Sequence, residues 1–219
     1  MNFYRRHWYQ LGIIWGAIVL MWLVASWDET GWLQRLCALN FIVVMLHQFE
    51  EYMWPGGFPA VMNIGMSGSE RPDRYPLNQH NATVTNVVLA YPFYLLPVFI
   101  PGHAWLGIPP ILFGLSQFGI HGIRANLAMK TLYNPGLATT ILGHIPVGIA
   151  YLWYGQSHGL FSGLDWGLGI LYTAAFVLLF RKYTFQWSPD INSVHPFTDI
   201  ELKRSGIFDR LTTRKKTGQ

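Results

Sequence analysis

Apolar residues gather in six long stretches along this chain, and short polar segments separate them. Each stretch approaches the roughly 20 residues that a helix needs to cross the hydrocarbon core of a bilayer. The expected spans are residues 11–27, 33–52, 82–100, 105–127, 137–154 and 166–182. Residues 82–100, for example, leave no polar face for water to hydrate. The pattern therefore predicts an all-α, polytopic membrane bundle of about six transmembrane helices.

The basic residues indicate how this bundle is oriented. In a six-helix arrangement most of them fall on one side of the membrane, and Arg35 is the only basic residue near the opposite connections. The positive-inside rule then predicts that both termini lie in the cytoplasm. The basic residues that support this orientation are Arg5, Arg6, Arg71, Arg74, Lys130, Lys203, Arg204, Arg210, Arg214, Lys215 and Lys216.

Composition agrees with a membrane domain followed by a basic tail. Hydrophobic residues make up 51% of the 219 residues and charged residues only 12%, about half of the ~25% that is usual in soluble domains. We expect residues 1–187 to form the six-helix transmembrane domain and residues 188–219 to form a solvated cytoplasmic tail drawn to anionic headgroups. The net charge of +4 comes without any base-reading motif, so no nucleic-acid partner is expected.

Two further features of the apolar spans bear on the kind of site they could hold. Cys37 is the only cysteine, which excludes an intrachain disulfide and a thiolate metal cage. Prolines inside the spans remove helical hydrogen-bond donors, so we expect kinked helices around a cavity. These prolines are Pro92, Pro97, Pro109, Pro110 and Pro146.

Ionisable residues crowd the end of the second span. Glu50 and Glu51 follow His47 by three and four residues, so at helical spacing all three side chains share one face. Ionisable groups inside a membrane are expensive and indicate function by default. The cluster therefore predicts a metal or proton-transfer site, although His47 alone could be a packing residue and the two glutamates could reach water at the interface.

Other spans bring histidines to a similar depth. His80 precedes the third span, His121 lies toward the cytoplasmic end of the fourth, and His144 lies in the fifth. Polar residues share the faces of these histidines and are candidates for binding a substrate headgroup or orienting ligands. They are Asn86, Gln117, Arg124, Asn126 and Tyr151. Arg124 could instead anchor its helix at the interface, and single histidines often satisfy a kink.

Imidazole and carboxylate together favour a divalent metal, zinc first, with iron or manganese as alternatives. We expect a metal-dependent hydrolase acting on a membrane lipid or another hydrophobic small molecule. His47, His121 and His144 would hold the ion with one glutamate, His80 is a further candidate ligand, and the other glutamate would take a proton from bound water.

Three other functions use the same residues. A di-iron or di-manganese centre would oxidise or desaturate a lipid chain. A metal-free isomerase would use Glu50 and Glu51 as an acid-base pair on a sterol-like or terpenoid substrate. A proton- or cation-coupled transporter would use the cluster as an ion site. The pattern gives no indication of the oligomeric state.

The motif His47-Gln48-Phe49-Glu50-Glu51-Tyr52, followed by Pro55-Gly56-Gly57-Phe58, resembles the HXXEE family of bacterial integral membrane proteins. The segments Asn78-Gln79-His80-Asn81 and Gly143-His144-Ile145-Pro146 extend the resemblance. It implies a multi-pass protein of the bacterial inner membrane in which His47, Glu50 and Glu51 are important. It implies no particular activity.

Overall fold

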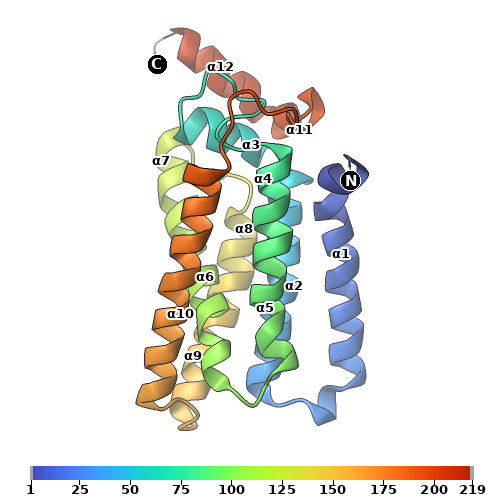
Figure 1. The fold of residues 1–219 in the computed structure, drawn as a ribbon, viewed down its shortest axis with the longest axis vertical. Helices are drawn as coiled ribbons and strands as arrows, with labels where there is room; N and C mark the ends of the chain where they lie inside the picture. The colour runs from blue at the N-terminus through green and yellow to red at the C-terminus, as the bar shows by residue number, and fades with distance from the viewer. Residues whose placement is uncertain (1, 218–219) are drawn as a thin grey trace.

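Six long helical runs lie side by side in the computed structural model of this chain, which describes residues 2–217 and the side chains of residues 2–213 (Figure 1). No strand occurs among residues 2–217. In chain order the runs are α1 (Asn2–Ala25); α2 (Trp32–Tyr52); α4, η3 and α5 (Gln79–Thr83, Val84–Leu89, Ala90–Phe99); α6, η5 and α7 (Ile108–Gln117, Phe118–Ala125, Asn126–Met129); α8, η6 and α9 (Leu137–Thr139, Thr140–His144, Ile145–Ser157); and α10 and η7 (Gly163–Lys182, Tyr183–Trp187).

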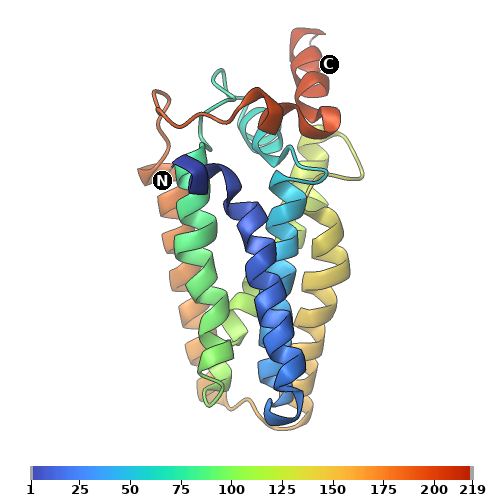
Figure 2. The same cartoon turned by 90° about the vertical axis from the view of Figure 1, so that its right-hand side faces the viewer.

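Short helices close the two ends of this bundle. The 3₁₀ turns η1 (Trp27–Glu29) and η4 (Ala104–Leu106) lie at one end. The other end is covered by a cap, which is drawn at the top of Figures 1 and 2. The cap consists of α3 (Phe58–Ala60), η2 (Val61–Met66), α11 (Asp199–Lys203), η8 (Arg204–Gly206) and α12 (Ile207–Thr217).

The apolar spans expected from the sequence are present as helices. Five of the six runs are long and apolar enough to cross a membrane, and α2 is not among these five. Its interior polar residues, such as Asn40, His47 and Gln48, lower its hydropathy. The all-helical fold with several candidate spans is confirmed. The sixth crossing and the cytoplasmic position of the termini stay predictions, and both termini lie at the capped end (Figures 1 and 2).

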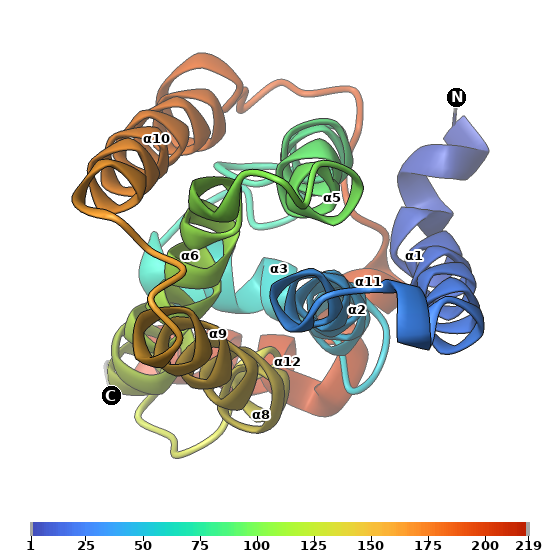
Figure 3. The same ribbon diagram turned by 90° about the horizontal axis from the view of Figure 1, so that it is seen from below.

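Helix α2 is the central element of the bundle. It packs against α1, α5, α6, α8 and α9, and the view along the bundle shows it enclosed by its neighbours (Figure 3). Twelve of its 21 residues are buried. A helix that meets protein on most sides has no need of an apolar surface, because its polar groups find partners on the neighbouring helices. This position explains how α2 carries a cluster of ionisable residues.

The expected proline kinks take the form of wide, π-helical turns. Pro146 has no N–H to donate to the carbonyl of Leu142. In the turn just before it, the Ile145 N–H donates to the carbonyl of Thr140, five residues back. The same pattern precedes Pro92, where the Ala90 N–H donates to the carbonyl of Thr85. Such turns are common at functional sites because they shift the helical register.

An apolar groove separates α5 from α10 on the outside of the bundle. Helix α10 lies at the edge and packs against α6 (Figure 3). The rings of Phe93 and Phe176 stack with centroids 3.5 Å apart and join the two helices. The side chains lining the groove include Pro92, Phe93, Leu96, Tyr172, Phe176 and Leu179.

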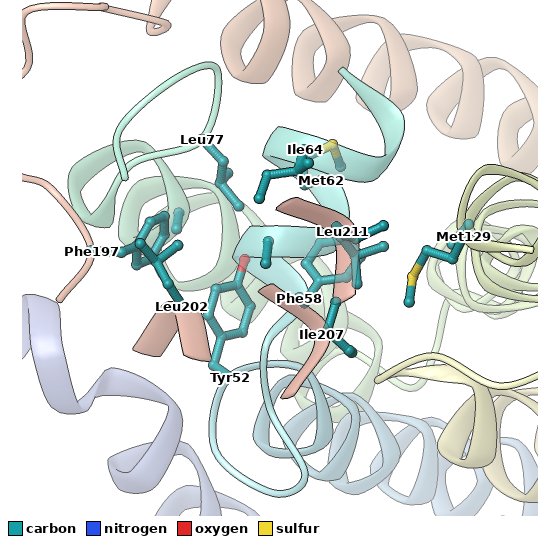
Figure 4. Packing of buried hydrophobic residues seen from close by; sticks show 14 of the residues in the cluster. Tyr52, Phe58, Met62, Ile64, Leu77, Met129, Phe197, Leu202, Ile207 and Leu211 are labelled. Carbon is teal, nitrogen blue, oxygen red and sulfur yellow. The ribbon is translucent and has the colours of Figure 1, made fainter. Parts of the chain in front are cut away.

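The C-terminal tail folds over the bundle instead of remaining a solvated segment. Phe197, Leu202, Ile207 and Leu211 are buried in one cluster with residues of α3, η2 and the end of α2 (Figure 4). The expectation of a wholly solvated tail was wrong because the tail is amphipathic and buries its apolar face. The side chains of Arg214, Lys215 and Lys216, and residues 218–219, lie outside the described part of the chain.

A glycine turn after α2 holds the tail against the bundle. Gly57 has φ +93°, and a Cβ atom there would lie 2.7 Å from the carbonyl oxygen of Arg204. The Arg204 guanidinium donates to the carbonyl of Tyr52, and the Ser205 hydroxyl donates to the carbonyl of Gly56 at 2.9 Å. The turn thus requires glycine both for its backbone conformation and for the close approach of the tail.

We expect Gly57→Ala to loosen the tail. Gly68→Ala is the matched control, because Gly68 also has a positive φ (+62°) but has no atom within 4 Å of an added Cβ. Both variants bear the backbone cost of about 1 kcal/mol, and only the first forces Arg204 away. Limited proteolysis should release the C-terminal segment several times faster in Gly57→Ala than in Gly68→Ala. Equal rates would show that the close approach does not hold the tail.

Candidate functional site

Three ionisable side chains from two runs meet inside the bundle. His47 and Glu51 come from α2 and His121 comes from η5. Glu51 Oε1 lies 3.3 Å from His121 Nε2 and 3.8 Å from His47 Nε2. One ligand atom from each residue lies within 4.8 Å of the other two, and all three residues are buried. These three residues could hold a metal ion.

His144 adds a third imidazole to the group. It lies on η6, and its ring centroid is 5.3 Å from that of His47. The residue is 1% exposed, and its Nε2 is one of four buried side-chain atoms without a hydrogen-bond partner among the described residues. A buried polar atom without a partner carries a free-energy cost, so its presence here needs a reason. The His144 ring lies beside that of His47, although the three residues that could hold a metal ion do not include it.

The bond between Asn134 and His121 determines which nitrogen of His121 faces the group. The Asn134 amide nitrogen donates to the His121 carbonyl at 2.7 Å and to Asn126 Oδ1 at 2.8 Å. The atom that meets His121 Nδ1, at 2.7 Å, is therefore the amide oxygen. Because an amide oxygen only accepts, Nδ1 carries a proton and donates to Asn134, so Nε2 is the nitrogen that faces Glu51.

The other two imidazoles have the same arrangement. Asn40 Oδ1 lies 3.1 Å from His144 Nδ1, and Thr139 Oγ1 lies 2.9 Å from His47 Nδ1. Each of the three rings thus has an oxygen at Nδ1, and the Nε2 atoms of His47 and His121 face Glu51. A histidine that ligates a metal almost always has such a partner on its other nitrogen.

Glu50 does not point toward these rings, although the sequence suggests it as a ligand or a base. Oε1 accepts hydrogen bonds from Tyr133 and from the Ala138 N–H, and Oε2 accepts from Thr139. Four donated hydrogen bonds use both carboxylate oxygens, because Thr139 contributes its N–H and its hydroxyl. Burial, and secondly the Glu50 carboxylate, raise the pKa of Tyr133, so this loop hydroxyl remains a donor.

His80 lies away from the group. It is exposed in the first turn of α4, and its ring faces His195 of the tail at 5.6 Å. Asn78 is the N-cap residue of α4, and its side chain accepts from the His80 N–H. This contact sets the start of the helix and turns His80 outward. The structure therefore does not bring His80 together with the other candidate ligands.

Two of the expected substrate-binding residues also lie elsewhere. Arg124 is exposed on the surface of η5, which agrees with the alternative of an interfacial anchor. Tyr151 is buried in an apolar cluster two turns beyond His144, and its hydroxyl donates to the carbonyl of Ala104. Residues seven positions apart in an α-helix lie about 10 Å from each other along the helix axis. Tyr151 is therefore too distant from His144 to serve the site.

The remaining candidates have supporting positions. The Asn126 side chain accepts from Asn134 and so stabilises the residue that orients His121. Asn86 accepts a hydrogen bond from Gln48, which joins η3 to α2. Gln117 is partly buried at the end of α6 and stays a predicted substrate-binding residue.

Sequence patterns missed the residues that orient the imidazoles. Asn40 precedes His47 by seven residues, which is two helical turns on one face, so helical spacing could have identified it. Asn134 lies in the loop before the fifth span, where no periodic pattern exists, and Thr139 lies in the first turn of that span, five residues before His144. Their role depends on how that loop folds back toward η5 and α2.

A family model matches residues 38–151, which is more than half of the chain, and it is described as a protein of unknown function with an HXXEE motif. The chain belongs to this HXXEE family. The matched region contains every residue of the buried group, and it ends before α10 and the tail. None of the curated proteins or solved structures matches the chain significantly.

A glycine on the neighbouring run makes room for the third imidazole of this HXXEE protein. A Cβ atom at Gly114 would lie 2.6 Å from His144 Nδ1. Gly119, one turn later in the same run, has no atom within 4 Å of an added Cβ. The absence of a side chain at Gly114 therefore allows the His144 ring and Asn40 to meet.

We expect Gly114→Ala to destabilise the protein and Gly119→Ala to leave it unchanged or stabilise it by up to about 1 kcal/mol. A helical glycine normally costs that amount relative to alanine. At Gly114 the added methyl group displaces a buried ring, which typically costs about 1–3 kcal/mol. Thermal unfolding in detergent measures both. A stabilised Gly114→Ala variant would show that the site tolerates movement of His144.

Proposed function

We propose that this chain is a membrane-embedded, metal-dependent enzyme with one divalent ion bound by His47, Glu51 and His121. The observation that carries this proposal is the separation of the donor atoms, 3.3 and 3.8 Å. Bonds of about 2.0–2.1 Å in a tetrahedral arrangement put two zinc ligands roughly 3.3–3.4 Å apart. The two nitrogens and one oxygen therefore suit zinc with its fourth position open, and iron or manganese are the alternatives.

The protonation of the rings supports the same proposal. Metal binding needs the lone pair of a neutral imidazole. The oxygens of Thr139 and Asn134 accept from the Nδ1 atoms of His47 and His121, so in the neutral form of each ring Nε2 carries the lone pair that would bind the ion. Such partners fix ring orientation and raise the basicity of the ligand.

The number of available donors favours one ion over two. A carboxylate-bridged pair of irons or manganese ions needs several carboxylates and histidines. In this chain Glu50 is occupied by its own hydrogen bonds and His80 faces the tail. Among the residues that the structure describes, Glu51 is then the one carboxylate left to bind an ion at the group, which supports hydrolysis with a single ion over oxidation by a pair.

We assign His144 the role of general base. A bound divalent ion would lower the pKa of a water molecule so that it could act as a nucleophile near neutral pH. His144 Nε2 has a lone pair with no other partner, and it lies beside His47. Its Nδ1–H is held by Asn40, which would stabilise the ring after it accepts a proton. This role replaces the one expected for the second glutamate.

The surroundings of the group favour a lipid or another hydrophobic substrate. The rings of Phe58 and Tyr94 lie 5.2 Å from His121 and 6.3 Å from His144, so aromatic surface borders the donors. The group lies within the helical runs, toward the capped end. With both termini in the cytoplasm, this is the cytoplasmic side of what we propose to be the bacterial inner membrane.

Metal content tests the first part of the proposal. We expect protein purified without chelator to contain about one zinc per chain by elemental analysis, and His47→Ala, Glu51→Gln and His121→Ala each to contain little. His80→Ala is the matched control and should keep its metal, because His80 lies outside the group. Equal metal content in all four variants, or none in the unmodified protein, would contradict the proposed site.

A His144 variant tests the reaction separately. We expect His144→Gln to keep its zinc and to lose about 10²–10⁴-fold in turnover, the usual contribution of a general base. The measurement is release of fatty acid or headgroup products from a bacterial lipid extract in detergent, followed by mass spectrometry. His158→Gln, at an exposed loop position, is the control. Zinc-loaded protein that releases no product would rule out lipid hydrolysis and leave the metal site standing.

A further inference from the structure

We propose that Glu50 is a positioning residue that acts on His47 through Thr139. The two glutamates of the motif would then have different functions, with Glu51 binding the ion and Glu50 determining the orientation of the first histidine. The part of this inference that concerns metal affinity rests on the proposed function. The part that concerns the His47 ring does not.

The contacts of Glu50 leave it no capacity to bind an ion. Oε1 accepts from the Tyr133 hydroxyl at 3.0 Å and from the Ala138 N–H at 3.1 Å. Oε2 accepts from the Thr139 N–H at 2.8 Å and from the Thr139 hydroxyl at 2.5 Å. All four partners are donors, and the side chain is buried. Hydrogen bonds to a charged acceptor are the strong ones, so this contact fixes Thr139 in place.

The Thr139 hydroxyl transmits this constraint to His47. A hydroxyl has one proton to donate, and Glu50 Oε2 at 2.5 Å is the nearer acceptor, since the carbonyl of Gly136 lies at 3.3 Å. Its lone pairs are then left for His47 Nδ1 at 2.9 Å. Nδ1 must carry the proton, and Nε2 must present its lone pair to the site. Glu50, Thr139 and His47 thus form a directed chain of hydrogen bonds.

Helical geometry explains why adjacent glutamates have different functions. Glu51 follows His47 by four residues and lies on the same side of α2. Glu50 is rotated by about 100° from Glu51, and its carboxylate meets the first backbone N–H groups of the run that begins with α8. A negative charge is stabilised at the N-terminus of such a helix. The same contact holds α2 against the run that carries His144, so it sets the relative position of two imidazoles.

Thr139→Val and Thr139→Ser test this chain of hydrogen bonds. Valine has nearly the shape of threonine but no hydroxyl, and serine keeps the hydroxyl. We expect Thr139→Val to weaken zinc binding by about 10–100-fold, as removal of an outer partner of a ligand usually does, and Thr139→Ser to bind nearly as well as the unmodified protein. Competition with a chromophoric chelator measures the affinity.

The ring of His47 gives a readout that does not require the ion. The ¹⁵N chemical shifts of the metal-free protein should show His47 with its proton on Nδ1 in the unmodified protein and in Thr139→Ser. In Thr139→Val they should show a mixture of both tautomers, with thermal unfolding as the check on folding. An unchanged tautomer together with unchanged affinity in Thr139→Val would overturn the proposal. A changed tautomer in a protein that binds no zinc would overturn only the proposed metal site.

Glu50→Gln is compared with Tyr133→Phe, because each variant removes part of the same cluster of hydrogen bonds. Glu50→Gln places an amide N–H₂ group against the donors of Thr139 or Ala138, so we expect it to weaken zinc binding to a similar extent as Thr139→Val. Tyr133→Phe removes one donor to Oε1 and leaves the Thr139 contacts intact, so its affinity should change little. Full zinc affinity in Glu50→Gln would exclude the positioning function.

Discussion

The site depends on hydrogen bonds to the Nδ1 atoms of three buried imidazoles. A polar group inside an apolar bundle has no water to satisfy it, so each unpaired atom costs free energy. Each ring has one oxygen at Nδ1, which comes from Thr139 for His47, from Asn134 for His121 and from Asn40 for His144. These bonds favour the tautomer with the proton on Nδ1 and hold each ring in place, and the Nε2 atoms of His47 and His121 face Glu51. The donor set exists because the opposite side of each ring is satisfied.

The bundle is arranged so that these partners come from different runs. The central position of α2 brings its polar face against η5 and η6. Both of these segments are π-helical and therefore wider than an α-helix. Pro146 causes one of these wide turns, and the shifted register places His144 beside His47. The loop before α8 then folds back so that Asn134 reaches His121. Local departures from regular helix are therefore part of how the site is assembled.

The apolar pattern predicted the helical fold because transmembrane length and hydropathy leave few alternatives. The similar depth of the fourth and fifth spans added His121 and His144, and helical spacing placed Glu50 and Glu51 on the face of His47. Helical spacing could not separate Glu50 from Glu51, because their directions depend on the rotation of α2 about its axis. That rotation is set by packing against α1 and by the bond from Glu50 to the start of α8, and neither leaves a periodic pattern.

Residues at helix ends and in the C-terminal tail were predicted least well. His80 follows a helix cap formed by Asn78, and the cap turns it outward. The tail looked solvated because its basic residues dominate its composition, while the few apolar residues that bury it lie in α11, in α12 and in the loop before them. Phe197 and Leu211 contribute to the cluster, but short amphipathic segments give only weak periodic signals, so their burial required the structure.

The cap joins the tail to the donor group through one residue. Phe58 lies in the same buried cluster as the tail residues Leu202 and Ile207, and its ring packs against that of His121. Any opening of the cap therefore moves a ring that borders the proposed ion. A polar substrate arriving from the water at the capped end would have to displace this apolar cluster and expose it to water. A hydrophobic molecule arriving from the bilayer would leave the cluster buried, and this difference in cost favours entry between the helices.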